Sequence, residues 1–306
     1  LAEAKLLPRH HLGLYSGLTG IGLTLVRAGA LLGEASLMAD GAALIRRACS
    51  GAKDDVLLDL MGGIAGAILA LLAVGTANVA DDVELAVRLA EQLYAAGQRE
   101  GDDLTWHPTR ASGSDVGPRP LTGLSHGAAG MGLALLEVGA RSGRTDLRLA
   151  GEAAFRYENK NYSTEHKNWF DLRTAATPSN FRERPSFSIA WCHGAPGIGL
   201  ARLRAMQLFA GQAQWLTDAH AALHTTRTVL SRLLDDRTCD PTPCHGLAGL
   251  FELLLTASDM LQNSELAAEV LAGWRVLIEL HQEKVTSWPS GFPSGGKSPG
   301  LMLGLA

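Results

Sequence analysis

Two short stretches of this chain carry residue types that bind metal ions. Cys192–Gly194 and Cys244–Gly246 both have the sequence Cys-His-Gly. Cysteine thiolates and histidine imidazoles are the ligands of many protein zinc sites. A single Cys-His pair is more often a buried thiol beside a hydrogen-bonded histidine, because free cysteine is common in protein cores. Two copies of the pair in one chain favour a shared zinc site.

A repeated unit connects the two stretches. In each copy a glycine leads into an apolar run, mostly through a Gly-x-x-Gly step. Amphipathic runs between the copies, at residues 82–98, 212–234 and 264–283, place apolar residues at three- and four-residue steps. We therefore predict helical hairpins whose apolar helices form an inner layer, giving an all-α fold, an α/α toroid. The first glycines of the six copies, the last cut off by the chain end, are Gly17, Gly63, Gly127, Gly194, Gly246 and Gly304.

The repeat register groups the polar residues of three consecutive copies. Equivalent positions in a closed ring of repeats lie at similar heights, so these residues should converge at one end of the toroid. Cys192, Cys244 and His245 can then meet one metal ion. The position two before the glycine is Ser125, Cys192 or Cys244, and the position directly before it is His126, His193 or His245.

Four other residues are candidates for chemistry. Cys239 lies outside the repeat register and is therefore a weaker candidate for a metal ligand. Cys49 is interpreted as a core or surface thiol without a role. His126 is placed for proton transfer beside a metal, but a hydrogen-bonded core histidine explains it equally well. Asp59 precedes an apolar helix, and its chemistry alone favours a cap or first-turn carboxylate.

Composition narrows the class of protein. The chain has 306 residues, of which 46% are hydrophobic, as expected of a globular protein with a large core. A net charge of −4 gives no electrostatic case for a nucleic-acid partner or an anionic membrane surface. Four cysteines without a secretory segment favour a reduced, cytoplasmic protein. The longest apolar stretch, residues 60–75, is short for a membrane span and predicts a buried helix.

Three segments interrupt the helical pattern, at residues 101–122, 159–188 and 284–299. They are rich in proline, glycine, serine and polar residues. Because long loops in compact domains tend to be functional, we expect them to form walls of a substrate groove.

Several motifs together resemble the lanthionine synthetase C-like (LanC-like) cyclases. A further segment and the last residues are similar to the cyclase half of class II (LanM-type) lanthipeptide synthetases. The resemblance covers essentially the whole chain. The residues that carry it are Gly123–Gly127, Trp191–Gly199, Cys244–Gly246, Tyr157–Glu158 with Asn168–Arg173, and Ser298–Ala306.

The resemblance implies an α/α toroid with one catalytic zinc ion. Cys192, Cys244 and His245 match the three protein ligands of that ion. His126 matches the proposed acid/base histidine, and Asp59 matches a carboxylate thought to assist. Three ligands leave the fourth zinc position open for a substrate thiol.

The sequence departs from the family pattern at two positions. Some cyclases carry an arginine four residues before the first zinc cysteine, where this chain has Ser188. The arginine's role does not transfer to Ser188, and Arg184 is only a speculative substitute. They also have tyrosine after that cysteine, where this chain has His193, whose role is left open.

The implied reaction joins a peptide cysteine to a dehydroalanine or dehydrobutyrine of the same peptide, giving a lanthionine or methyllanthionine ring. The partners are a dehydrated precursor peptide, with leader and core, and a dehydratase part upstream in the same polypeptide. We expect residues 1–306 to form a single cyclase domain, a fragment that lacks this dehydratase and the final inner helix. Such a fragment should expose an apolar seam.

Other functions stay open at this stage. A LanC-like enzyme that adds glutathione or another thiol to dehydroamino acids would share the zinc site. A carbohydrate-active or prenyl-group enzyme could share the toroid, although the repeats show no evident pair of catalytic carboxylates. A non-enzymatic peptide-binding protein would use a closed four-ligand zinc site, with Cys239 or His193 as the fourth ligand.

Overall fold

The computed structural model describes residues 12–52, 56–75, 79–107, 119–173, 186–237, 240–282, 288–291 and 300–304. The chain divides into two compact units. The first unit comprises residues 1–121, 125–160 and 172–177, and the second comprises residues 122–124, 161–171 and 178–306. Helices dominate both units. Among the described helices, none has the length and apolar character needed to cross a membrane.

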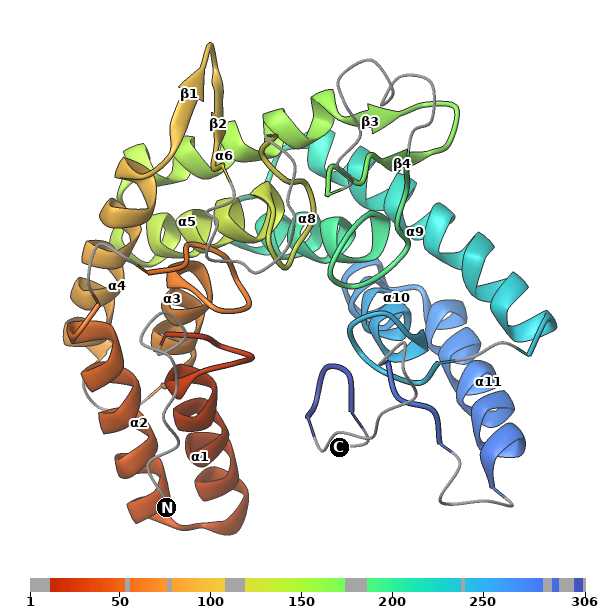
Figure 1. The fold of residues 1–306 in the computed structure, drawn as a ribbon, viewed down its shortest axis with the longest axis horizontal. Helices are drawn as coiled ribbons and strands as arrows, with labels where there is room; N and C mark the ends of the chain where they lie inside the picture. The colour runs from red at the N-terminus through yellow and green to blue at the C-terminus, as the bar shows by residue number, and fades with distance from the viewer. Residues whose placement is uncertain are drawn as a thin grey trace. The chain divides into compact units, whose positions relative to one another are not determined.

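The first unit consists of three helical hairpins in two layers (Figure 1). Helices α1, α3 and α5 contact one another in sequence and form one layer, and α2, α4 and α6 form the other. A short antiparallel hairpin, β1 (Gln98–Glu100) and β2 (Asp103–Thr105), follows α4 and packs on α6. The hairpins pair α1 (Leu18–Leu32) with α2 (Ala35–Ser50), α3 (Ile64–Ala73) with α4 (Val79–Ala95), and α5 (Ala128–Ser142) with α6 (Thr145–Lys160).

The second unit repeats this plan with two hairpins. Helix α8 (Ala195–Leu208) pairs with α9 (Ala213–Asp235), and α10 (Leu247–Leu261) pairs with α11 (Ser264–His281). The two apolar helices, α8 and α10, contact each other. A second antiparallel hairpin precedes them, formed by β3 (Tyr162–Ser163) and β4 (Asn168–Trp169).

The helices agree with the sequence prediction. The three amphipathic runs correspond to α4, α9 and α11, and the apolar run at residues 60–75 contains the buried helix α3. The segments expected to be loops instead hold parts of the two β-hairpins, together with residues outside the described ranges. Their role as groove walls stays a prediction.

Every apolar helix begins directly after the first glycine of its repeat. The residue at the N-cap of these helices is glycine each time and has no side chain to cap the helix. At α1, α3, α5 and α10 a first-turn N–H group donates to a carbonyl seven residues earlier, as from Ala128 to Leu121 at 3.0 Å and from Leu247 to Asp240 at 2.7 Å. At α8 the Ala195 N–H donates to the side chain of Asn168. The residues before each helix, here called the lead-in loop, therefore fold back over its first turn, and at the other four helices they satisfy donors that would otherwise lack partners.

This fold-back explains the Gly-x-x-Gly step. A Cβ atom on Gly194 would overlap the carbonyl oxygen of Ser188, and one on Gly197 would overlap that of Trp191. Gly194 also has a φ of 84°, which L side chains rarely adopt. The glycines thus bring the lead-in loop against the helix, and this loop carries the candidate site residues.

The Gly194→Ala variant is therefore expected to be strongly destabilised, because a positive φ and a backbone overlap act together. We expect a loss of at least about 3 kcal/mol in the free energy of unfolding. Gly211→Ala is the matched control, since Gly211 has a φ of 91° but open space around its Cβ position. It should lose only about 1–2 kcal/mol. Equal losses in denaturant unfolding would contradict the fold-back explanation.

Main-chain hydrogen bonds join the lead-in loops of successive repeats within each unit. In every case the acceptor is the carbonyl two residues before a repeat glycine, the position of both candidate cysteine ligands. The backbone at that position is thus held by the neighbouring repeat. The bonds run from Tyr15 to Met61 (3.1 Å), Leu60 to Ser125 (3.0 Å), Leu124 to Cys192 (3.1 Å) and Cys244 to Met302 (3.0 Å).

Candidate metal centre and histidine–aspartate pair

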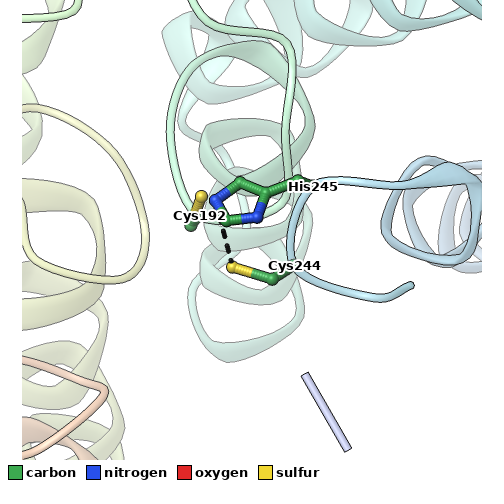
Figure 2. Close-up of side chains that lie close together, drawn as sticks. All are labelled: Cys192, Cys244 and His245. Carbon is green, nitrogen blue, oxygen red and sulfur yellow. Dashed lines mark hydrogen bonds between the residues drawn. The ribbon is translucent and has the colours of Figure 1, made fainter. Parts of the chain in front are cut away.

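Three side chains of the second unit converge on a possible metal position. One ligand atom each of Cys192, Cys244 and His245 lies within 4.8 Å of the others. Figure 2 shows the imidazole of His245 beside both thiols, with a contact of 3.6 Å between Cys244 Sγ and His245 Nε2. Both cysteines are buried and His245 is exposed, so the group opens to solvent on the side of the histidine.

The geometry of this group fits a zinc ion. Tetrahedral zinc, with bonds of about 2.3 Å to sulfur and about 2.0–2.1 Å to nitrogen, holds neighbouring donors roughly 3.4–3.8 Å apart. The contact between Cys244 and His245 lies within this range, and the remaining donor distances need at most a modest contraction. Two soft sulfur donors and one imidazole also suit zinc better than a hard cation such as magnesium.

The surroundings of Cys192 favour the ionised form of its thiol. Its pKa is held well below the usual value, chiefly by hydrogen bonding with Cys244 and then with His245, while burial acts in the opposite direction. Positive charge on His193 contributes as well. Cys49 contrasts with it, because burial raises the pKa of that thiol to about 12. Since the thiolate is the metal-binding form, Cys192 is suited to a metal and Cys49 is inert.

His126 and Asp59 form a pair in the first unit. Asp59 Oδ2 lies 2.7 Å from His126 Nδ1, and Asp59 Oδ1 accepts a hydrogen bond of 2.7 Å from the Gly62 N–H. The Asp59 side chain is only 11% exposed, whereas that of His126 is 40% exposed. Asp59 is therefore neither the N-cap nor a first-turn carboxylate of α3, as its chemistry alone favoured, because Gly62 precedes the helix. The carboxylate instead joins the lead-in loop to the imidazole of His126. The Nδ1 nitrogen of His126 thus faces the aspartate.

Comparison with known proteins decides the family. No curated protein sequence matches the chain significantly. The family profile described as "Lanthionine synthetase C-like protein" matches residues 2–306. The chain belongs to the lanthionine synthetase C-like family. Among solved structures, a nisin cyclase is similar with a TM-score of 0.62 and 18% identity, covering 89% of this chain and 70% of that one. This likeness shows the α/α toroid fold predicted from the repeats.

The structure shows the contacts of the two residues that depart from the LanC-like pattern, Ser188 and His193. Ser188, in place of the family's arginine, donates a 2.8 Å hydrogen bond from Oγ to Asp171 Oδ2. Arg184 lies outside the described residues. His193 is buried and is not among the three converging ligands, because its Nδ1 lies 3.3 Å from the Thr122 carbonyl. Cys239, the other candidate fourth ligand, also lies outside the described residues.

The sequence analysis did not identify the side chains that stabilise the lead-in loop carrying Cys192. Asn168 and Thr122 are almost completely buried and hydrogen-bond to backbone near that loop. The sequence analysis singled out the segment that contains Asn168 as a loop and for its family resemblance, but gave Asn168 no role of its own. The sequence does not show which groups a buried asparagine will bond. The two partners of Asn168 in the loop, Ser188 and Ala195, lie 20 and 27 residues away in the chain.

Proposed function

We propose that this protein is a zinc-dependent lanthipeptide cyclase. It would add cysteine thiolates of a dehydrated precursor peptide to dehydroalanine or dehydrobutyrine, forming lanthionine or methyllanthionine rings. The observation that carries the proposal is the group of two buried cysteines and one exposed histidine. Family membership over residues 2–306 and a nisin cyclase among similar structures support it.

Cys192, Cys244 and His245 would hold the zinc ion and leave its fourth position open. Bound zinc would keep a peptide cysteine in its thiolate form at neutral pH. Two sulfur ligands from the protein donate charge, so the substrate sulfur would stay nucleophilic. The exposed side of His245 gives a peptide chain room to approach.

His126 would complete the addition as a general acid. The substrate sulfur forms a bond to the β-carbon, the carbon–carbon double bond opens, and its electron pair moves to the α-carbon as an enolate. Asp59 accepts a hydrogen bond from Nδ1–H of protonated His126 and stabilises its charge, so that Nε2–H can protonate the α-carbon. The proton released by the substrate thiol balances this transfer.

We further propose that both units belong to one cyclase domain, since one family profile spans them. The substrate already contains dehydroamino acids, so a reaction that removes water from serine or threonine must precede this one. An upstream dehydratase part of the same polypeptide would supply that reaction.

The test is incubation of the zinc-loaded protein with a peptide that carries one dehydroalanine and one cysteine. Cyclisation should leave the peptide mass unchanged while removing its reactivity towards a thiol-alkylating reagent. A second sample contains glutathione. An increase by the mass of glutathione would favour the thiol-adding alternative, and a peptide that binds but stays alkylatable would favour a binding protein. Either outcome would replace the proposed function.

A further inference from the structure

Two segments far from Cys192 in the sequence contact the lead-in loop that carries it, which begins at residues 186–190. They are residues 122–124 and residues 168–171, and like the loop they belong to the second unit. Phe170 bridges to Phe187, and the Asp171 N–H donates a 2.8 Å hydrogen bond to the Ser186 carbonyl. The loop therefore begins as a strand-like partner of residues 170–171.

Asn168 joins the two ends of this loop through its side chain. Its Nδ2 donates to the Ser188 carbonyl at 2.9 Å, before Cys192. Its Oδ1 accepts from the Ala195 N–H at 2.9 Å, after Cys192, and from the Trp169 N–H at 2.9 Å. Asn168 is 1% exposed, so water does not compete for these bonds.

The loop between these two anchors is narrow. Ile189 and Gly194 form an isolated bridge, and the Ala190 N–H donates to the His193 carbonyl at 3.1 Å. Cys192 lies at the tip of this turn. The Asn168 amide spans the base of the turn, from residue 188 to residue 195, and therefore sets the direction in which the tip points.

Residues 122–124 support the same arrangement. Thr122 Oγ1 donates to the Phe170 carbonyl at 2.6 Å, and the Leu124 N–H donates to the Cys192 carbonyl at 3.1 Å. The second bond holds the backbone of Cys192 from outside the loop, and the first joins residues 122–124 to residue 170. The side chain of Asn168 joins the two ends of the loop, because the amide of asparagine supplies both the donor and the acceptor that these ends require.

We propose that Asn168 is a positioning residue for the metal centre, which holds Cys192 Sγ in register with Cys244 and His245. Without the amide, the two ends of the turn separate and the sulfur of Cys192 leaves the ligand position. This inference rests on the proposed zinc ligation by Cys192.

The test compares zinc affinity, by chelator competition, in the wild-type chain and the variants Asn168→Ala and Asn168→Asp. Asn168→Ala should raise the zinc dissociation constant at least about tenfold, as for other residues that orient metal ligands. Asn168→Asp can keep the two acceptor bonds but places a buried carboxylate oxygen against the Ser188 carbonyl oxygen, so it should also raise the zinc dissociation constant. With Co²⁺ in place of zinc, Asn168→Ala should also change the thiolate-to-cobalt absorption bands.

Asn263→Ala is the matched control for a merely structural effect. Asn263 caps α11 by accepting from the Glu265 N–H at 3.1 Å, away from the cysteine ligands in the chain. This variant should lower the thermal unfolding midpoint without changing zinc affinity or the cobalt spectrum. Wild-type affinity and an unchanged spectrum in Asn168→Ala would overturn the inference. Failure of the wild-type chain to bind zinc would instead overturn the proposed ligation.

Discussion

The Cys244→Ala variant should lose stoichiometric zinc and, with it, thioether formation. The Sγ of Cys244 lies 3.6 Å from His245 Nε2 and within 4.8 Å of the Cys192 donor, so its removal leaves only two ligands. Two ligands hold zinc far more weakly than three, and hydrogen bonding with Cys244 is also the main cause of the low pKa of Cys192. Zinc content per chain, measured by atomic emission after dialysis, should fall from about one to near zero.

Cys49→Ala is the matched control for this experiment. Cys49 is also a buried free thiol, but it lies in the core of the first unit, whereas the three candidate ligands belong to the second unit. This variant should keep one zinc ion per chain, even if the small cavity lowers its stability by about 1 kcal/mol. Full zinc content in Cys244→Ala would remove Cys244 from the ligand set, whatever the cyclisation assay gives.

The helical part of the fold could be predicted because its signals are local. Glycines such as Gly63 and Gly246 mark helix starts since the fold-back leaves no room for a side chain there. The β-hairpins could not be predicted in the same way. Strand β1 is three exposed polar residues, Gln98–Glu100, and β4 is only two residues long, so neither shows the alternation that identifies a strand.

The repeat register also predicted which side chains approach one another. It grouped Cys192 and Cys244 with His193 and His245, and the donors of Cys192, Cys244 and His245 do lie together, although their role stays a prediction. The register could not separate His193 from His245, because both follow a cysteine and precede a glycine. Their difference is tertiary: His193 is turned to the carbonyl of Thr122 and buried, whereas His245 faces the cysteine sulfur and solvent.

His126→Ala should slow ring formation strongly while leaving zinc binding intact. The proposed reaction needs one proton at the α-carbon, and Nε2 of His126 is the proposed donor because Nδ1 is engaged by Asp59. Loss of a positioned general acid slows a reaction by about 100-fold to 10,000-fold. The rate of thiol loss from a dehydrated peptide, at saturating peptide, measures this effect, and zinc content shows that the metal site survives.

Two further variants separate catalysis from folding. Asp59→Asn can keep the Gly62 hydrogen bond through its remaining oxygen but removes the charge that stabilises protonated His126, so it should slow cyclisation less than His126→Ala does. His107→Ala replaces an exposed histidine after β2 and should cyclise at the wild-type rate. If His126→Ala cyclised as fast as His107→Ala, the proton would have to come from water or from the peptide. Asp59 would then keep only its structural role in the lead-in loop of α3, through its hydrogen bond from Gly62.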